Sequence, residues 1–260
     1  MSGRIDLTLA DGVARLHFNC PERMNVLDPV MADSFAAAVA DVLADPSIRV
    51  LLMTGAGRSF MAGGDLASFH GAENKADPIR ATIPPIHRGL LALEKSPVVT
   101  LVAAQGRVAG AGVSLVAGAD LALAEEGASF TLAYCRIGAV PDCGGSWALP
   151  RAVGLKRAME MALLNEPVPA EQACRIGLIN RVVPAGRLEE DAVAMAHRVA
   201  AGPGFAQGRA KALLRAAFET SLADQLDAEE ASFLTCVERR DFREGVGSFL
   251  ERRSPEFNKD

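Results

Sequence analysis

The sequence predicts an α/β fold with a helical C-terminal region, on three observations. Short apolar runs that suit buried strands alternate with segments that can be helical over roughly the first half of the chain. Two of these runs end in glycine-rich turns, at 59–66 and 105–115, each of which leads into a possible helix. From about Ala152 onward the apolar residues recur at helical spacing. A strand–turn–helix unit that is used more than once is typical of an α/β core.

The N-terminal elements are predicted by their turn and cap residues. Residues 6–9 and 13–18 flank an Asp-Gly pair, which favours a tight β-hairpin. Asp28 followed by Pro29 predicts the start of a helix that continues to about Leu43, because aspartate is a favoured N-cap and proline a favoured first helical residue.

The later elements are predicted by apolar runs and by helix-breaking residues. Three further apolar runs are expected to be buried strands: 50–54, 98–102 and 121–124. The glycine and proline residues between His70 and Ile86 predict a mobile loop. Gly177 is predicted to end a helix. A final helical layer is expected over 192–201, 205–218 and 222–237.

Composition and charge limit the classes of function. Half of the 260 residues are hydrophobic, which is enough for one large domain with a substantial core. The net charge of −5 argues against general binding to nucleic acid or membrane surfaces. The five cysteines contain no C-x-x-C pair, and no two of the four histidines have metal-ligand spacing. Because the N-terminus also lacks an apolar signal segment, we expect a cytoplasmic protein without a metal, nucleic-acid or membrane partner.

The two glycine-rich turns predict a site for a negatively charged oxygen. Glycine lets the backbone approach a ligand closely. The N–H groups at the start of a helix lack intrahelical partners and can point at negative charge. Two such groups that converge on one oxygen form an oxyanion hole, which would stabilise the enolate of a carbonyl compound.

Five segments resemble motifs of the crotonase, or enoyl-CoA hydratase/isomerase, superfamily, and they occur in the family's order: 19–27, 54–66, 105–112, 137–145 and 242–252. The resemblance implies a spiral of repeated strand–strand–helix units with a helical C-terminal trimerisation region. It divides the chain into a core at 1–195, for acyl-CoA binding and catalysis, and a helical region at 196–260. It also implies a homotrimer or a dimer of trimers.

The resemblance further implies an acyl-CoA thioester as substrate, so that coenzyme A is part of the substrate and no separate cofactor is expected. The thioester oxygen would lie between the backbone N–H groups of Gly64 and Ala111. The family usually has three consecutive glycines where this chain has Gly-Ala-Gly at 110–112. Residues at matching positions would contact CoA: Arg23, Met24, Ala62 and Leu66, with Phe249 and Arg252 packing the adenine of a neighbouring subunit.

Three positions decide which reaction of the family is expected. Hydratases carry two glutamates that activate water, and here Ser114 and Tyr134 stand at those positions. Neither residue is a carboxylate, so simple hydration of a 2-enoyl-CoA is not expected. Both residues are expected to line the acyl pocket, together with His87 and much of the segment between His70 and Ile86.

Asp142 is the expected catalytic residue. The resemblance to the isomerase branch implies that one carboxylate removes a proton beside the thioester carbonyl and returns it two carbons along. This chemistry needs a single acid/base group, because the oxyanion hole holds the intermediate dienolate. We therefore expect a shift of a 3-enoyl-CoA double bond to position 2. Apolar side chains nearby are expected to disfavour the charged carboxylate, namely those of Ile137, Val140 and Trp147.

Other interpretations of these residues stay open at the level of sequence. Asp142 also suits an N-cap of the following helix. In the aryl-CoA dehalogenase branch an aspartate at this position is a nucleophile, and an aromatic residue there stands at the position of Tyr134. A hydratase-like enzyme and a non-catalytic acyl-CoA binder are further alternatives. Cys135 and Cys143, which lie on either side of the site in sequence, are expected to be inert buried packing residues.

Overall fold

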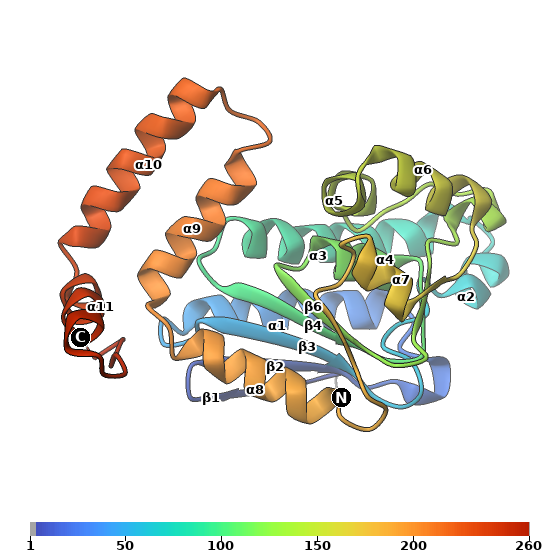
Figure 1. Cartoon of the computed structure of the whole chain (residues 1–260). Helices are drawn as coiled ribbons and strands as arrows, with labels where there is room; N and C mark the ends of the chain where they lie inside the picture. The colour runs from blue at the N-terminus through green and yellow to red at the C-terminus, as the bar shows by residue number, and fades with distance from the viewer. Residues whose placement is uncertain (1–3, 260) are drawn as a thin grey trace.

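The fold is built on a six-stranded sheet, seen in a computed structural model that describes residues 4–259 (Figure 1). Its strand order is β1-β2-β3-β4-β6-β9. The strands are β1 (Ile5–Ala10), β2 (Val13–Phe18), β3 (Val50–Gly55), β4 (Val99–Ala104), β6 (Leu121–Glu125) and β9 (Arg181–Val183). The first two strands form the expected antiparallel hairpin, and the other neighbours pair in parallel.

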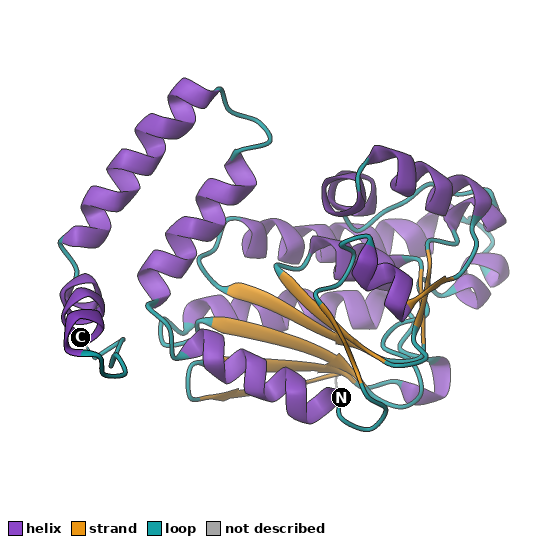
Figure 2. Cartoon of the chain, in the orientation of Figure 1, coloured by secondary structure: helices purple, strands orange, loops and turns teal. Residues whose placement is uncertain are grey.

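A second, three-stranded sheet stands beside the first (Figure 2). It has the order β5-β7-β8 and consists of β5 (Arg107–Ala109), β7 (Ser129–Thr131) and β8 (Val168–Pro169). β5 follows β4 in the sequence, and β7 follows β6. Each of these successive units therefore contributes one strand to the large sheet and one to the small sheet. This repetition confirms the expected α/β class and the spiral of strand–strand–helix units.

Helices cover both faces of the large sheet. On one face, α1 (Pro29–Ala44) and α3 (Ala76–Glu94) enclose a core in which the Phe18 ring stacks on Phe35 at 6.3 Å and meets Phe60 edge-on at 5.7 Å. On the other face, α8 (Leu188–Ala200) packs Met195 and small residues against β2, β3, β4 and β6. The N-cap expected for α1 is confirmed, since the Asp28 carboxylate accepts a hydrogen bond from the Met31 N–H at 2.9 Å.

The prediction of a mobile loop between His70 and Ile86 is wrong. This segment belongs mostly to α2 (Leu66–Gly71) and to α3, with only four residues between the two helices. Pro78 is the third residue of α3, in the first turn, where a helix does not require the N–H that proline lacks. Pro84 and Pro85 lie inside α3, where burial of Pro85 and Ile86 against the core outweighs their poor helix propensity.

The remaining helices flank the small sheet or extend from the C-terminal side. Near the small sheet lie α4 (Ala111–Gly118), α5 (Gly145–Val153), α6 (Leu155–Leu164) and α7 (Ala170–Arg175). Gly177, with φ of +84°, follows α7 as expected. The C-terminal helices α9 (Gly204–Ala216), α10 (Leu222–Val237) and α11 (Arg240–Glu251) form an arm, of which α10 and α11 project away from the sheet (Figure 1). The expected division at 195/196 stays a prediction, and α8 continues across it.

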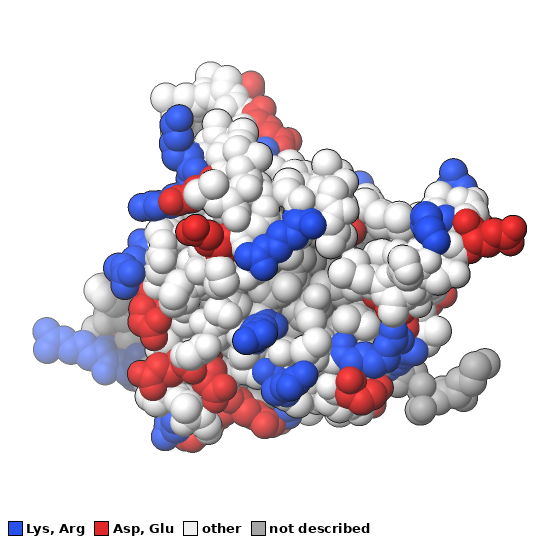
Figure 3. Space-filling model, turned by 90° about the vertical axis from the view of Figure 1, so that its right-hand side faces the viewer, with Lys and Arg blue, Asp and Glu red and all other residues white. Residues whose placement is uncertain are grey.

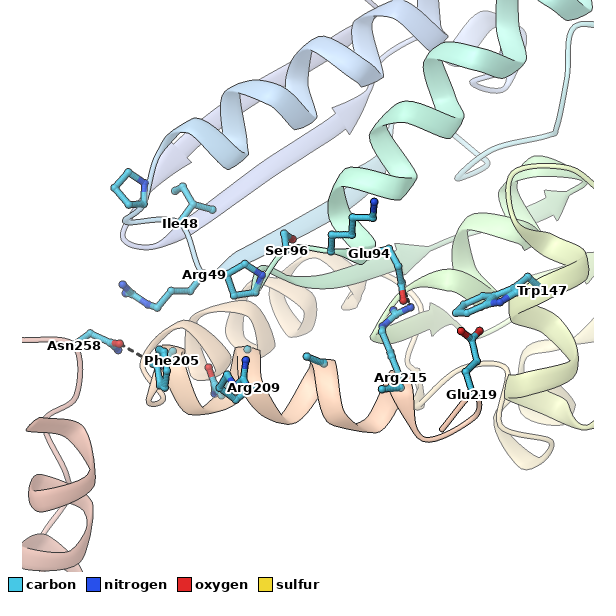
Figure 4. Close-up of a pocket in the computed structure, with 18 residues that line it drawn as sticks. Ile48, Arg49, Glu94, Ser96, Trp147, Phe205, Arg209, Arg215, Glu219 and Asn258 are labelled. Carbon is cyan, nitrogen blue, oxygen red and sulfur yellow. Dashed lines mark hydrogen bonds and ion pairs between the residues drawn. The ribbon is translucent and has the colours of Figure 1, made fainter. Parts of the chain in front are cut away.

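A buried ionic cluster attaches α9 to the core, and Figure 4 shows two of its members, Glu94 and Arg215. Lys211 donates to the carbonyls of Leu93 and Val98, and its ammonium lies 3.0 Å from the Asp120 carboxylate. Arg215 reaches the other oxygen of Asp120 at 2.6 Å and also pairs with Glu94. A cavity of about 790 Å³ lies beside this cluster, between α9 and the core. Among the helices in the described part of the chain, none has the length and apolar character that crossing a membrane requires.

Candidate active site at two glycine turns

The two glycine-rich turns lie against each other, although about fifty residues separate them in the sequence. The Ala109 N–H donates to the Met61 carbonyl at 3.0 Å. A methyl group placed on Gly110 would lie 3.4 Å from the Gly63 Cα, so the two backbones are nearly in contact. Gly110 has φ of +52° and is the N-cap of α4, a conformation that favours glycine.

Two backbone N–H groups at this contact are free. Within residues 4–259, the N–H groups of Gly64 and Ala111 donate no hydrogen bond. Ala111 is the first residue of α4, and therefore its N–H has no intrahelical acceptor. Gly64 directly follows Gly63 in the neighbouring turn. Both residues stand where the sequence predicted oxyanion donors.

Two polar side chains that the sequence analysis missed hold the first turn in place. The Asn25 amide is fully buried and donates to the carbonyls of Ala56, Ser59 and Phe60. The Gln105 amide donates to the carbonyl of Gly55 at 2.6 Å. Asparagine tolerates the left-handed conformation better than most residues, and Asn25 adopts it, with φ of +54°. The residue type at this position was therefore the available sequence signal for its structural role.

Four of the expected CoA contacts lie beside the first glycine turn. The Ala62 N–H donates to the Met24 carbonyl at 3.0 Å, and Leu66 begins α2 with a half-exposed side chain. The Arg23 guanidinium forms ion pairs with Asp28 at 3.2 Å and with Asp65 at 2.5 Å. The Arg23 guanidinium is therefore bound to carboxylates of the protein itself.

Asp65 has a structural role beside this turn. Its carboxylate accepts from the Ser68 N–H at 3.3 Å and caps α2. Phe249 and Arg252 are not near these residues. They lie in and directly after α11, on the opposite side of the molecule from α2 and α4 (Figure 1). Any contact that they make with a ligand at the glycine turns must therefore involve another subunit.

Ser114, Tyr134 and Asp142 form one chain of hydrogen bonds. Tyr134 begins the short 3-10 helix η2 (Tyr134–Ile137), and its hydroxyl donates to Oδ1 of Asp142. Ser114 is buried on α4, and its Oγ lies 3.3 Å from the same tyrosine hydroxyl. The Tyr134 ring also reaches the second glycine turn, since a methyl group on Gly110 would lie 3.9 Å from its Cζ.

Burial and charge keep the groups around Asp142 protonated. Burial, and then the charge of Asp142, raise the pKa of Tyr134 far above its usual value near 10. Burial likewise raises the pKa of the Cys143 thiol, with Asp142 again the next cause. At neutral pH the tyrosine hydroxyl is therefore a hydrogen-bond donor and cannot act as a base.

One alternative interpretation of this region is excluded, and two expectations are wrong. Asp142 does not cap α5, whose N-cap is Gly144 without any side-chain hydrogen bond, because the Asp142 carboxylate turns toward Tyr134 instead. The apolar side chains of Ile137, Val140 and Trp147 are exposed and do not enclose the carboxylate. Cys143 is buried as expected, but Cys135 is exposed because it lies on the outer side of η2.

His87 lies on α3 with an exposed side chain. On the face of the molecule at the right of Figure 1, several basic side chains lie around the middle, and most acidic side chains lie toward the edges (Figure 3). In the part of the chain from 4 to 259, no cluster of three or more His, Cys, Asp or Glu side chains has the arrangement of a metal site.

Comparison with known proteins identifies close relatives. Residues 8–260 match the family model described as enoyl-CoA hydratase/isomerase. The chain is 38% identical over 248 residues to 1,2-epoxyphenylacetyl-CoA isomerase of Escherichia coli, covering 95% of each chain. It is also 38% identical to a probable enoyl-CoA hydratase of Rhodobacter capsulatus, covering 96% of this chain and 95% of the relative.

A solved structure has the same fold. The crystal structure of a putative enoyl-CoA hydratase/isomerase from Mycobacterium abscessus superimposes with a TM-score of 0.92 at 32% identity. The superposition covers 98% of this chain and all of that one.

Proposed function

The chain belongs to the enoyl-CoA hydratase/isomerase family, and we propose that within this family it is an isomerase that moves a 3-enoyl-CoA double bond to position 2. Asp142 is its single acid/base group. The observation that carries the proposal is the direction of the Asp142 carboxylate, which accepts a hydrogen bond from Tyr134 instead of capping its own helix. The ring of that tyrosine reaches the second glycine turn. The residues at the two hydratase glutamate positions supply hydroxyl groups and no carboxylate.

The proposed reaction is a balanced proton transfer. Asp142 removes a proton from C2 of the acyl group, and the electron pair of that C–H bond moves toward the thioester carbonyl. The resulting dienolate oxygen accepts hydrogen bonds from the N–H groups of Gly64 and Ala111. The same carboxylic acid then returns the proton to C4, which leaves the double bond between C2 and C3. General acid–base catalysis of this kind contributes roughly 10²–10⁴-fold to a rate.

A second candidate reaction is the isomerisation of 1,2-epoxyphenylacetyl-CoA. It is favoured by the 38% identity to the Escherichia coli enzyme of that name. The same oxyanion site would hold the thioester, and the product would again be an isomer of the substrate. A dehalogenase reaction, in which Asp142 attacks an aromatic ring, and simple acyl-CoA binding without turnover remain the other outcomes to be tested.

The test is turnover of the purified protein with 3-enoyl-CoA, 2-enoyl-CoA and 1,2-epoxyphenylacetyl-CoA, with products resolved by chromatography and Asp142→Ala measured alongside. We expect the 3-enoyl substrate to yield the 2-enoyl product, without hydroxyacyl-CoA, and the variant to lose roughly 10²–10⁴-fold in rate. Rapid hydration of the 2-enoyl substrate would contradict the proposal. Isomerisation of the epoxide alone would favour the second candidate. Binding without any product would call for halogenated aryl-CoA substrates, and no turnover of those would favour a non-catalytic protein.

A further inference from the structure

We propose that Tyr134 is a positioning residue, which orients the Asp142 carboxylate for proton transfer through the hydrogen bond from its hydroxyl. The inference rests on the proposed role of Asp142 as the acid/base group. It gives Tyr134 a role in the reaction beyond the expected one of lining the acyl pocket.

Tyr134 holds both ends of the loop that carries Asp142. At the start of the loop, the Tyr134 carbonyl accepts from the N–H of Ala139 at 3.0 Å and from that of Gly138. At its other end, the Tyr134 hydroxyl donates to Asp142. Because the backbone of Tyr134 closes the turn to Ala139 and its side chain reaches Asp142, eight positions further along the chain, the position of the carboxylate depends on this tyrosine.

The backbone on either side of this pair is held in an unfavourable conformation. Ala133 has φ of +61° and Cys143 has φ of +50°, and neither residue is a glycine. A left-handed conformation is unfavourable for a residue other than glycine. Such positions persist only where the surrounding structure determines them, and they gather at functional sites. Here they flank Tyr134 and Asp142 directly.

Ser114 fixes the tyrosine hydroxyl from the other side. Since the Tyr134 proton is donated to Asp142, the Ser114 hydroxyl is the donor across the 3.3 Å to the tyrosine oxygen. Ser114 itself is held tightly, because a methyl group placed on Gly145 would lie 2.3 Å from its Oγ. Ser114 is on α4, one turn after Ala111, and so the hydrogen-bonded chain connects Asp142 to the helix that presents an oxyanion donor.

The chain contains a single tyrosine, which allows a direct spectroscopic test without substrate. Protein labelled with ¹³C at the tyrosine Cζ gives one resonance, from Tyr134. We expect this resonance to differ between the native protein and Asp142→Asn, because the variant replaces the charged acceptor of the tyrosine hydroxyl with a neutral amide. The same resonance position in both proteins would overturn the inference.

Kinetics of Tyr134→Phe provide the second readout, because phenylalanine keeps the ring and removes only the hydroxyl. A hydrogen bond to a charged group is worth about 1.5–3 kcal/mol, and therefore we expect kcat to fall roughly 10–100-fold with KM changed by less than about threefold. Cys135→Ser, an exposed neighbour on η2, is the matched control and should behave as the native enzyme. An unchanged kcat in Tyr134→Phe would contradict the inference.

The two readouts separate this inference from the proposed function. If the protein catalyses no isomerisation but the Tyr134 resonance follows Asp142, the proposed function fails and the positioning contact stands. If isomerisation depends on Asp142 while the resonance is the same in Asp142→Asn, only the positioning role fails. If Tyr134→Phe does not fold, the resonance of the native protein and of Asp142→Asn decides.

Discussion

At the scale of the residue, the site depends on backbone groups more than on side chains. The N–H groups of Gly64 and Ala111 are free because one lies in a tight turn and the other at a helix start. The family usually has glycine at the position of Ala111, yet alanine suits it here because Gly110 adopts the left-handed conformation in its place. A side chain at position 111 therefore leaves the donor intact.

Ala111→Pro tests the donor at this position. Proline is favoured at the first residue of a helix but has no N–H, so it removes the donor with little change to α4. We expect kcat to fall roughly 10²–10³-fold, as for the loss of one oxyanion donor elsewhere. Ala111→Gly, which keeps the N–H, is the matched control and should stay close to the native rate. Equal rates for the two variants would show that this N–H does not contribute.

At the level of single helices, α9 is attached to the core by buried ion pairs as well as by apolar packing. Burial by itself would raise the pKa of Asp120, but Lys211 and Arg215 outweigh it and hold that pKa below the usual carboxyl range. A carboxylate of this kind stabilises the fold wherever it stays ionised. Arg215 also caps the C-terminal end of α4, since its guanidinium donates to the Gly118 carbonyl at 3.0 Å.

Asp120→Asn should lower the free energy of unfolding by about 3–5 kcal/mol at neutral pH, because it leaves Lys211 buried without its partner. The folded-state pKa of Asp120 is lower than the unfolded value of about 3.9. The difference in stability between native protein and variant is therefore fully present above the unfolded pKa. It is lost as the pH falls through the lower, folded-state pKa of Asp120. Urea unfolding at several pH values measures it. Asp227→Asn, at an exposed position on α10, is the control, and a pH-independent difference for Asp120→Asn would contradict the account.

The sequence predicted the elements that have strong local signals. The hairpin at Asp11-Gly12, the cap at Asp28 and the stop at Gly177 are all present, because each depends on residues a few positions apart. The segment from His70 to Ile86 was predicted incorrectly, since tertiary burial of one face of α3 overrides the proline signal. The bond from Tyr134 to Asp142 also escaped prediction. Both side chains were recognised, but their contact depends on how the intervening loop folds back.

At the scale of the whole molecule, the C-terminal arm leaves large apolar side chains exposed. Figure 1 shows α10 and α11 projecting from the α/β core. Their side chains at Leu222, Phe233 and Phe249 are 75%, 63% and 82% exposed. Apolar surface of this extent on a projecting helical arm favours association with another protein surface.

We propose that the partner is a second and a third copy of this chain, in a homotrimer. The separation of α11 from the glycine turns agrees with this assembly, because Phe249 and Arg252 could then approach CoA bound to a neighbouring subunit. Light scattering during size-exclusion chromatography should give three times the chain mass of 27.3 kDa, or twice that for a dimer of trimers. A monomer at micromolar concentration would contradict this assembly.

The role of Asp142 as the single acid/base group is tested most directly by following deuterium from C2 of a 3-enoyl-CoA into the product, for the native protein and for Asp142→Asn. We expect 2-enoyl-CoA with deuterium at C4 from the native protein, because one carboxylate both removes and returns the proton. We expect a rate lower by roughly 10²–10⁴-fold for the variant, which keeps the shape of the side chain without a base. Isomerisation by Asp142→Asn at the native rate would show that another group moves the proton.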